Sequence, residues 1–567
     1  MLYFELAKLY ESLSKTTKRL EKIKILSDFI AIFKDKEEFS YLLRGRVFPD
    51  YDSRELGVST QIILKAIARA TGVRIDEVVV SFKKNGDLGN VAFLILEKYK
   101  QNSLFSKNLS VEYVFTTLRK IEDITGKGAI DKKLALISEL LISAKPIEAK
   151  YIIRTLLSDL RIGVADAVLL EAINLNFFSG KKETLEKVQR AYDLLTDFAE
   201  VLKLCEKGIE SIEHVSLIPG RPTNVMLAVK VLNIDEAFEV CGKPAAFEHK
   251  YDGFRTLISS DGKNIHIFTR RLEDVTNQFP DIVSFIKEHV KAKKFIIDAE
   301  AVGYDSKTGK YLPFESVSQR IKRKYDIIDL SKKLPIELNV FDVLYLDGHS
   351  VVELPFKERR KILEKFIDDV PYKIRLATQL ITADESEANK FYNEALKIGE
   401  EGVMIKNLDS AYVSGRYVGT MAKLKPVVED LDLVIVGAEY GTGKRAGGLT
   451  SFIVAVKDRD KFLEIGKVSS GLKEKESEGT SYGEIDKLLQ PLIISENSDS
   501  VRVKPKIIVS VTYQNIQSSP SYSSGFALRF PRITHYRPDK DLRDIASLEE
   551  INKEVVKMSK RLGRKSI

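Results

Sequence analysis

The chain has 567 residues, of which 44% are hydrophobic and 30% are charged, and its formal net charge is +8. We expect a globular protein of about three or four domains without a membrane span, because no apolar run reaches roughly 18 residues, and without a signal peptide. The isolated Cys205 and Cys241 exclude a disulfide framework and a cysteine-rich zinc site and suit a cytoplasmic location, while the positive charge favours a polyanionic partner.

The chain divides into three segments with different predicted secondary structure. Helical periodicity dominates residues 1–213, and residues 217–222 then interrupt it like a linker. Short β-rich runs alternate with helical stretches, such as 356–366, up to about residue 426, which predicts an α+β domain with mostly antiparallel strands. Four or five short strands with Gly and Ser turns then predict a small barrel, followed by a charged helix at 547–564. The predicted strands are 254–259, 264–269, 294–302, 336–346, 402–406, 431–440, 451–458, 467–472 and 506–516.

The most informative segment is Lys250-Tyr251-Asp252-Gly253-Phe254-Arg255, which follows an apolar run. A free lysine has a pKa of about 10.4, so it must lose a proton before it can attack a phosphate. Partial burial and neighbouring cations favour the neutral amine, and Gly253 lets the backbone turn tightly beside a ligand. The segment therefore suits a nucleophilic amine. An exposed turn between two strands is the alternative interpretation of these six residues alone.

Further polar or aromatic residues lie at the predicted strands downstream. Taken singly, each has an ordinary explanation as a solvated turn or a core aromatic. Lys423 and Lys425 share one face of a strand, because strand side chains alternate with period two. The residues are Arg270, Arg271, Asp298, Glu300, Phe341, Glu401, Lys406, Lys423 and Lys425. Their order and chemistry together indicate a nucleotide site.

In that order these residues resemble the signature of the covalent nucleotidyltransferases, and most closely the archaeal ATP-dependent DNA ligases. The resemblance runs through nearly the whole chain, and Arg529-Phe530-Pro531-Arg532 and Arg537-Pro538-Asp539-Lys540 resemble the last motif. It implies that Lys250 is the catalytic lysine that becomes adenylated, and that Glu300 and Glu401 hold a metal ion. It implies nucleotide contacts by Glu248, Arg255, Arg270, Glu300, Phe341, Arg416, Lys423 and Lys425.

The same resemblance implies a multidomain fold and an activity. We expect an all-α DNA-binding domain (1–213), an α+β adenylation domain (214–427) and an OB-fold β-barrel with a C-terminal helix (428–567). The implied enzyme uses ATP and Mg²⁺ to seal 5′-phosphate/3′-hydroxyl nicks in duplex DNA through a lysyl-AMP, in replication, repair and recombination. Lys423 and Lys425 would lower the pKa of Lys250, and 537–540 would reach pyrophosphate when the barrel domain closes.

Nicked double-stranded DNA is the partner that the resemblance implies. Candidate phosphate contacts are Arg154, Arg161, Lys444 and Arg445, each of which could equally be a solvated surface charge. Gln101-Asn102-Ser103-Leu104-Phe105 resembles the short peptide by which archaeal ligases bind the sliding clamp (PCNA type), although such pentapeptides are common.

Several positions depart from the family or from other motifs. Ala299 stands where a glycine is usual, Met421-Ala422 stands where a tryptophan is common, and the spacing after Arg416 is shifted by a residue. Residues 441–445 resemble a P-loop only superficially. Ala438 stands where its first glycine belongs, and Arg445 stands where Ser or Thr should bind magnesium, so a basic hairpin turn is the better interpretation.

Three alternatives remain beside a DNA ligase that uses ATP. An RNA ligase or mRNA-capping enzyme uses the same lysine chemistry, but capping enzymes usually carry the lysine near the N-terminus. An NAD-dependent ligase would carry a cysteine-rich zinc module, which this composition lacks. A non-catalytic DNA-binding scaffold with a dead pocket would have no reason to keep Lys250, Glu300, Glu401, Lys423 and Lys425 together.

Overall fold

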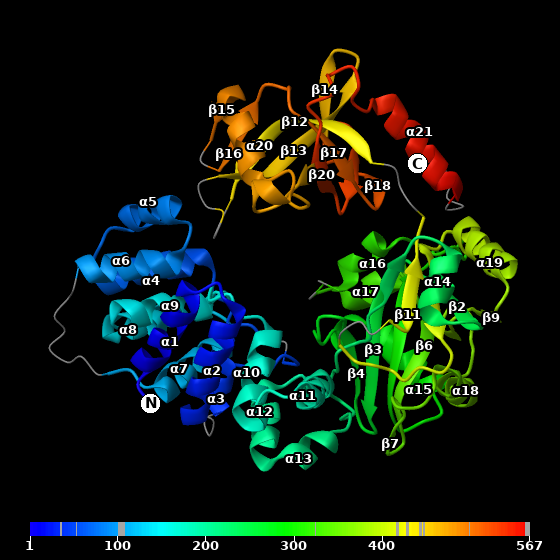
Figure 1. The fold of residues 1–567 in the computed structure, drawn as a ribbon, viewed down its shortest axis with the longest axis horizontal. Coiled ribbons are helices and arrows are strands. Elements are labelled where there is room, and N and C mark those ends of the chain that lie inside the picture. The colour runs from blue at the N-terminus through cyan, green and yellow to red at the C-terminus, as the bar shows by residue number, and fades with distance from the viewer. Residues whose placement is uncertain are drawn as a thin grey trace. The chain divides into compact units, whose positions relative to one another are not determined.

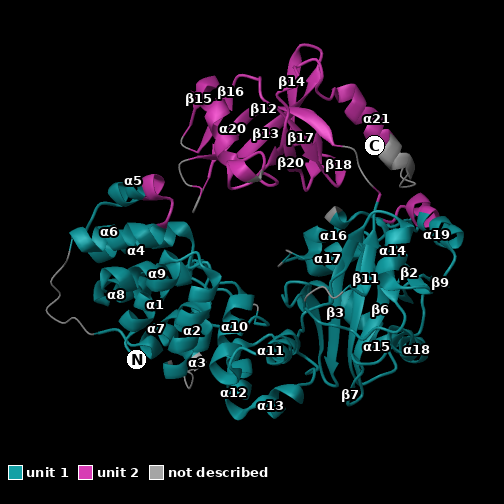
Figure 2. Cartoon of the chain, viewed as in Figure 1, with its two compact units in different colours: residues 1–81, 88–392, 401–425 teal, residues 82–87, 393–400, 426–567 magenta. Residues whose placement is uncertain are grey.

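The chain forms two compact units (Figure 2). The first contains residues 1–81, 88–392 and 401–425, and the second contains residues 82–87, 393–400 and 426–567. A computed structural model describes residues 1–33, 37–52, 54–99, 108–321, 323, 325–415, 419–426, 430–441, 445, 448–497 and 499–561.

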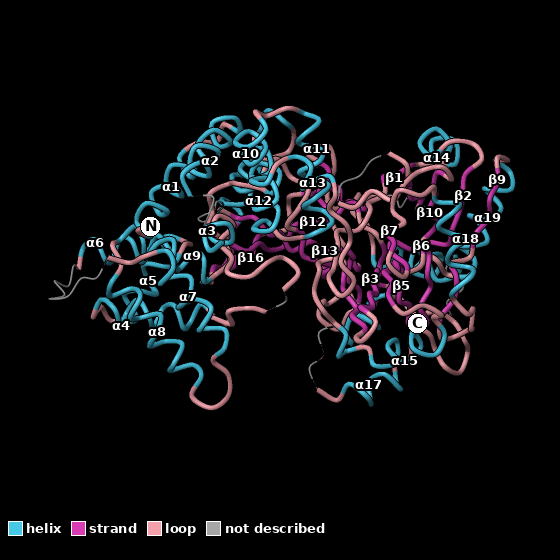
Figure 3. The backbone as a smooth tube through the Cα atoms, turned by 90° about the horizontal axis from the view of Figure 1, so that it is seen from below, coloured by secondary structure: helices cyan, strands magenta, loops and turns pink. Residues whose placement is uncertain are grey.

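Helices α1 to α13 make up the N-terminal part of the chain, and all of them except the end of α5 belong to the first unit (Figures 1 and 3). Its described residues up to 213 contain no strand, as predicted, and only an isolated bridge joins Leu2 to Ser110. The serine hydroxyls of Ser59 and Ser110 accept hydrogen bonds from backbone N–H groups three residues later, which caps α4 and α7. The helices are α1 (Tyr3–Lys15), α2 (Arg19–Phe33), α3 (Glu37–Leu42), α4 (Thr60–Thr71), α5 (Ile75–Asn85), α6 (Leu88–Lys98), α7 (Val111–Asp123), α8 (Ala129–Ser143), α9 (Pro146–Leu156), α10 (Asp166–Phe178), α11 (Lys182–Leu195), α12 (Phe198–Lys207) and α13 (Ile209–Glu213).

Two sheets form the rest of the first unit. Their strand orders are β1-β11-β10-β2-β9 and β4-β3-β5-β6-β7, with β8 beside β6. The described strand pairs are antiparallel apart from β1–β11 and β6–β8, as the sequence predicts. The strands are β1 (Val229–Val231), β2 (Ala245–Lys250), β3 (Phe254–Asp261), β4 (Ile265–Thr269), β5 (Lys294–Gly303), β6 (Ile336–Leu346), β7 (His349–Ser350), β8 (Ile374–Leu376), β9 (Gln379–Thr382), β10 (Gly402–Asn407) and β11 (Met421–Leu424).

Helices pack against the sheets and contribute apolar side chains to the hydrophobic core. Ile282 and Ile286 of α15, Val317 of α16 and Leu363 of α18 pack into the core of the second sheet. The five strands predicted between residues 254 and 406 and the helix at 356–366 are confirmed. The helices are α14 (Ile234–Cys241), α15 (Pro280–His289), α16 (Phe314–Ile321), α17 (Ile327–Lys333), α18 (Phe356–Phe366) and α19 (Glu385–Ile398).

The second unit is rich in strands. Its central strand β12 pairs with β13, β16 and β17, and β18 pairs separately with β19. Closure of this sheet into an OB-fold barrel stays a prediction. The elements are β12 (Leu431–Tyr440), β13 (Leu449–Asp458), β14 (Lys461–Val468), α20 (Tyr482–Leu489), β15 (Ile493–Glu496), β16 (Ser500–Val503), β17 (Ile508–Thr512), β18 (Asn515–Ser518), β19 (Phe526–Arg529), β20 (Arg532–Tyr536) and α21 (Leu548–Arg561).

Three expectations about segments need comment. The estimate of four or five C-terminal strands is too low, because it missed β15, β16, β19 and β20, which are runs of only four or five residues. The segment 217–222 has no helix or strand, as predicted, but Leu217 is buried beside Leu194 and Leu257, so it is packed. No helix in the described part of the chain is long and apolar enough to cross a membrane.

Candidate active site

Lys250 is the last residue of β2, which lies between β9 and β10 in the first sheet. The register pairs Glu248 with Met404 of β10, and Met404 with Lys423 of β11. Because alternate strand residues face the same side, Glu248, Lys250 and Lys423 lie on one face of the sheet. The predicted catalytic lysine and one predicted phosphate-binding lysine therefore share a surface.

The turn after β2 runs close against β5. A Cβ atom at Gly253 would lie 2.4 Å from the carbonyl oxygen of Ala301 and 3.0 Å from the side chain of Glu300. A side chain cannot occupy that space, so the close approach requires glycine. The turn thereby brings the Lys250 end of β2 next to Glu300 on the neighbouring sheet.

Glu401 connects two lysines at this point. Its Oε2 lies 2.6 Å from the Nζ of Lys250 and 2.6 Å from the Nζ of Lys425. The backbone N–H of Glu401 also donates to the carbonyl oxygen of Lys250, at 2.9 Å. The site thus holds two ammonium groups on one carboxylate oxygen, and the predicted grouping of Lys250, Glu401 and Lys425 is present.

The electrostatics differ from the expectation for Lys250. Burial by itself lowers the pKa of Lys250, but the carboxylates of Glu401 and Glu300 outweigh burial and raise that pKa above its ordinary value. Burial and the charge of Lys250 lower the pKa values of Lys423 and Lys425. The expectation that the two lysines lower this pKa stays a prediction, because the net upward shift comes from a carboxylate that stands between Lys250 and Lys425.

The two carboxylates predicted to hold a metal ion have opposite pKa shifts. Burial raises the pKa of Glu300 to about 7, and the charge of Glu401 adds to that rise. Burial would also raise the pKa of Glu401, but Lys250 and Lys425 lower it to about 2. Mg²⁺ is commonly held by one or two carboxylates together with phosphate oxygens, so this pair fits it. The described residues contain no group of three or more potential metal ligands.

Glu248 is buried and has three partners. The Nζ of Lys406 lies 2.6 Å from its Oε2, and the side chain of Gln379 donates to its Oε1 at 2.9 Å. The guanidinium of Arg360 lies 3.8 Å from Oε1. The predicted adenine contact is therefore fixed in place by cations and an amide rather than exposed at a strand end.

Arg255 is the centre of a buried network. Its guanidinium donates twice to Asp298, at 2.9 and 2.5 Å, and once to the carbonyl oxygen of Met226, at 2.6 Å. The hydroxyl of Tyr412 donates to Asp298 at 2.7 Å and accepts from Arg255 and from the backbone N–H of Met226. Arg255 thus ties β3 to β5 and to the segment that precedes β1.

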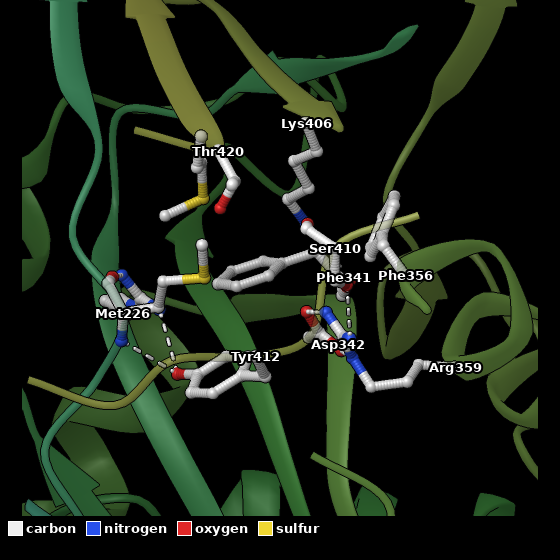
Figure 4. Close-up of a pocket in the computed structure, with 11 residues that line it drawn as sticks. Met226, Phe341, Asp342, Phe356, Arg359, Lys406, Ser410, Tyr412 and Thr420 are labelled. Atoms are coloured by element: carbon white, nitrogen blue, oxygen red, sulfur yellow. Dashed lines mark hydrogen bonds and ion pairs between the residues drawn. The ribbon is translucent and has the colours of Figure 1, made fainter. Parts of the chain in front are cut away.

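Phe341 of β6 projects into a pocket next to this network (Figure 4). In this view Tyr412 lies below the ring and Lys406 and Thr420 lie above it. The Nζ of Lys406 lies 4.7 Å from the ring centroid, and the guanidinium carbon of Arg255 lies 5.3 Å from it. The pocket is lined by Met226, Arg255, Phe341, Asp342, Phe356, Arg359, Lys406, Ser410, Tyr412, Thr420 and Met421.

The two remaining predicted nucleotide contacts are Arg270 and Arg416. Arg270 is exposed just after β4 and is close enough to Lys423 to lower its pKa. Arg416 lies outside the described residues. Gly415, which precedes Arg416, is packed so closely on Asp193 of α11 that a Cβ would lie 2.3 Å from its carboxylate.

The candidate DNA contacts have different surroundings. Arg154 is buried and donates to the carbonyl oxygen of Leu160 at 3.1 Å, so its interpretation as an exposed phosphate contact is wrong. Arg161 pairs with Asp159 at 2.9 Å, and Arg445 pairs with Glu474 over the ring of Tyr482. Lys444 and the clamp-like peptide Gln101 to Phe105 lie outside the described residues.

Sequence reasoning did not assign roles to Lys406, Gln379 and Tyr412. Lys406 was singled out as part of the nucleotide site, but its ion pair with Glu248 depends on the pairing of β10 with β2 and was not predicted. Gln379 and Tyr412 carried no signal. Gln379 reaches Glu248 only through the pairing of β9 with β2, and Tyr412 lies outside any helix or strand.

Comparison with known proteins identifies the family of the chain. Sequence profiles described as "DNA ligase N terminus", "ATP dependent DNA ligase domain" and "ATP dependent DNA ligase C terminal region" match residues 2–174, 225–425 and 445–540. A DNA ligase of Nanoarchaeum equitans is 46% identical over 99% of both chains, and one of Thermococcus fumicolans is 42% identical over 97% of this chain and 98% of its own. The chain belongs to the ATP-dependent DNA ligase family.

A solved ligase structure supports the fold. The structure titled "Pmar-Lig_PreS3" covers 94% of this chain and 99% of its own, with a TM-score of 0.57 and 17% sequence identity. The ligase fold of a helical N-terminal region, a central adenylation domain and a strand-rich C-terminal domain is therefore confirmed for this chain.

Proposed function

We propose that this ligase seals 5′-phosphate/3′-hydroxyl nicks in duplex DNA through an AMP bound covalently to Lys250. The observation that carries the proposal is the position of Lys250 at the end of β2, beside Glu401, Lys425 and Glu300. Nucleophile, cations and one carboxylate meet there at the ends of adjacent strands of the first sheet, and Glu300 comes from β5 of the second sheet. A non-catalytic scaffold would not need this grouping.

In the first step the neutral amine of Lys250 attacks the α-phosphorus of ATP. A P–N bond forms, the bond to the pyrophosphate oxygen breaks, and the electron pair leaves with pyrophosphate. Lys423 and Lys425 stabilise negative charge on the phosphate oxygens. Bound through Glu300 and Glu401, Mg²⁺ would neutralise phosphate charge and orient the leaving group.

Lys250 must lose its proton before it attacks. Glu401 is the carboxylate that holds Lys250 in its charged form, and Lys425 already shares that carboxylate. Once Glu401 is engaged elsewhere, Lys423 and Lys425 favour the neutral amine, because like charges disfavour ionisation. We therefore expect Lys423 and Lys425 to lower the pKa of Lys250 only when ATP and Mg²⁺ are bound.

The remaining residues position the nucleotide. We assign the adenine to Glu248 and Phe341, and the ribose and phosphates to Arg270, Arg416 and Glu300. Arg255 keeps β3, β5 and the segment at Met226 together and contributes to the nucleotide contacts. Phe341 and Arg255 line the pocket of Figure 4, and Glu248 pairs with Lys406 of that pocket. Glu300 lies near Lys250 and Arg270 lies near Lys423, whereas Arg416 is assigned by family resemblance alone.

In the second and third steps AMP moves to the 5′-phosphate at a nick, and the 3′-hydroxyl then attacks and releases AMP. We propose domains at 1–213, 214–427 and 428–567, with 537–540 approaching pyrophosphate during the first step.

We also propose that Gln101 to Phe105 binds a sliding clamp. Unchanged clamp affinity in a Phe105→Ala variant would contradict this.

A single-turnover chase tests the proposed reaction. The protein is incubated with ATP and Mg²⁺, freed of nucleotide, and mixed with a duplex that carries one nick. We expect one sealed nick for each adenylyl group on the protein, without added ATP. A matched RNA nick runs in parallel. An adenylyl group that stays on the protein beside nicked DNA, or that moves only to RNA, would contradict the proposal.

A further inference from the structure

Asp432, near the start of β12 in the second unit, is paired with two cations at once. The Nη1 of Arg537 lies 3.2 Å from both of its carboxylate oxygens, and the ammonium of Lys540 pairs with its Oδ2. The hydroxyl of Ser510 donates to its Oδ1. The side chain of Asp432 is 14% exposed, whereas those of Arg537 and Lys540 are 28% and 29% exposed. The carboxylate therefore lies beneath the two cations.

Three neighbouring strands produce this arrangement. Asp432 of β12 is paired in register with Ser510 of β17, and Ser510 is paired with His535 of β20. The chain leaves β20 at Tyr536, and the backbone N–H of Arg537 donates to the carbonyl oxygen of Ile508, at 2.9 Å. The position of Asp432 under Arg537 and Lys540 therefore follows from strand register.

The pairing has a physical consequence for the two cations. Their charges repel each other, and both are long side chains with many rotamers. Asp432 holds them at one place, and Asp539 fixes the other edge of Arg537 through bonds of 2.9 and 2.7 Å. Burial alone would raise the pKa of Asp432, but its bonds to Lys540 and Ser510 lower it, which keeps the carboxylate charged.

We propose that Asp432 is a positioning residue that holds Arg537 and Lys540 together as a two-cation cradle for the pyrophosphate end of ATP. This inference rests on the proposed function, because it assigns the cradle to the lysyl-AMP step. It adds a residue of β12, outside the motif at 537–540, to the requirements of that step.

The opposite role for Asp432 would be a latch that keeps the two cations away from phosphate. Positioning is favoured because both cations remain partly exposed above Asp432 and keep donors to spare: an ammonium group has three N–H donors. The extra attraction that a freed cation would have for phosphate is also screened by salt at an exposed site. The two roles predict changes of opposite sign.

Pyrophosphorolysis tests the cradle directly. A pyrophosphate oxygen attacks the phosphorus of lysyl-AMP and the P–N bond breaks. Its electron pair returns to the Lys250 nitrogen, which takes up a proton from solvent, and ATP is released. The substitution is Asp432→Asn, which keeps the shape and removes the charge. The control is Glu439→Gln on the same strand, which removes an exposed ion pair with Lys467. The readouts are the pyrophosphate concentration for half-maximal ATP release and the rate at which a preadenylated nick is sealed.

For Asp432→Asn we expect at least a tenfold rise in the half-maximal pyrophosphate concentration, and a loss of ATP-dependent adenylation at least tenfold larger than any loss in sealing. Glu439→Gln should match the wild type. Equal losses in both assays would reduce Asp432 to a structural residue, and unchanged or faster adenylation would favour the latch; either result overturns the inference. Wild-type protein that takes up no adenylyl group would instead overturn the proposed function.

Discussion

At the scale of single residues, the carboxylate of Glu401 is the centre of the site. It binds Lys250 and Lys425 through one oxygen and raises the pKa of Lys250, the proposed nucleophile. A charged ammonium does not attack phosphorus, so we propose that the arrangement keeps Lys250 inactive until Glu401 is engaged by another cation. In this proposal Glu401 controls when the amine reacts.

Glu300 gives a pH-dependent prediction. Its pKa is raised from 4.5 to about 7, so the stability linked to its proton is fully present below pH 4.5 and is lost as the pH rises through 7. At 1.36 kcal/mol per pKa unit, the loss is at most roughly 3 kcal/mol. We expect the thermal midpoint of wild-type protein to fall more than that of Glu300→Gln between pH 5 and pH 7.5, by calorimetry.

Magnesium provides the control for this effect. A cation beside Glu300 favours the ionised carboxylate, so added Mg²⁺ should reduce the difference between wild type and Glu300→Gln at pH 7.5. Parallel pH profiles for the two proteins would show that Glu300 titrates normally.

The sequence predicted the residues that surround Lys250 better than it predicted the pKa of Lys250. Glu300, Glu401, Lys423 and Lys425 could be placed by motif order. The pKa of Lys250 could not, because it depends on which charge lies between Lys250 and Lys425, and that contact is set by strand register. Tyr412 was missed for a related reason, since its partners Met226 and Asp298 are distant in the chain.

At the scale of elements, the register of the first sheet builds the site. Glu248, Met404, Lys423 and Lys230 lie in one row across β2, β10, β11 and β1. The alternation rule predicted that Lys423 and Lys425 share a face, and both neighbour Lys250 electrostatically. A slip of one residue in any of these strands would turn its charges to the other face.

The turn between β2 and β3 gives the prediction at this scale. In Gly253→Ala the new Cβ would lie 2.4 Å from the carbonyl oxygen of Ala301, so the turn must move away from β5. Such overpacking typically costs about 1–3 kcal/mol. We expect a lower thermal midpoint and at least a tenfold slower adenylation, measured by transfer of labelled AMP from ATP to the protein.

Gly483→Ala is the matched control for this substitution. Gly483 lies in α20, and its nearest potential contact is the Ser481 hydroxyl at 4.0 Å, so a methyl group fits there. Both properties should stay at wild-type values in that variant. Normal adenylation in Gly253→Ala would mean that the close approach to β5 does not position Lys250.

Elements were predictable where their apolar pattern was long. The strands at 336–346 and 431–440 and the helix at 356–366 agree closely with β6, β12 and α18. The short strands β15, β16, β19 and β20 were missed, because four or five residues do not establish an alternation. Their pairing comes from the core of the second unit, which a local pattern cannot reveal.

At the scale of the whole molecule, the order of the three predicted regions follows the ligase family, but compactness separates only two units. Asn224 bonds to Asp193 of α11, and Arg190 pairs with Glu353 at 2.8 Å. Such contacts join residues on both sides of the predicted boundary at 213 and 214, which stays a prediction. Charge pattern and motif order indicate function across the chain, whereas domain limits depend on packing.

The most direct test of the account is the intact mass of the purified protein after incubation with ATP and Mg²⁺, without DNA. Wild type is compared with Lys250→Ala and with a control, Lys243→Ala. Lys243 lies just before β2, and its replacement removes only an exposed ion pair with Glu385. We predict one added adenylyl group on wild type and on Lys243→Ala, and none on Lys250→Ala. Adenylation of Lys250→Ala, or a wild type that is modified by GTP or NAD but not by ATP, would contradict the central claim.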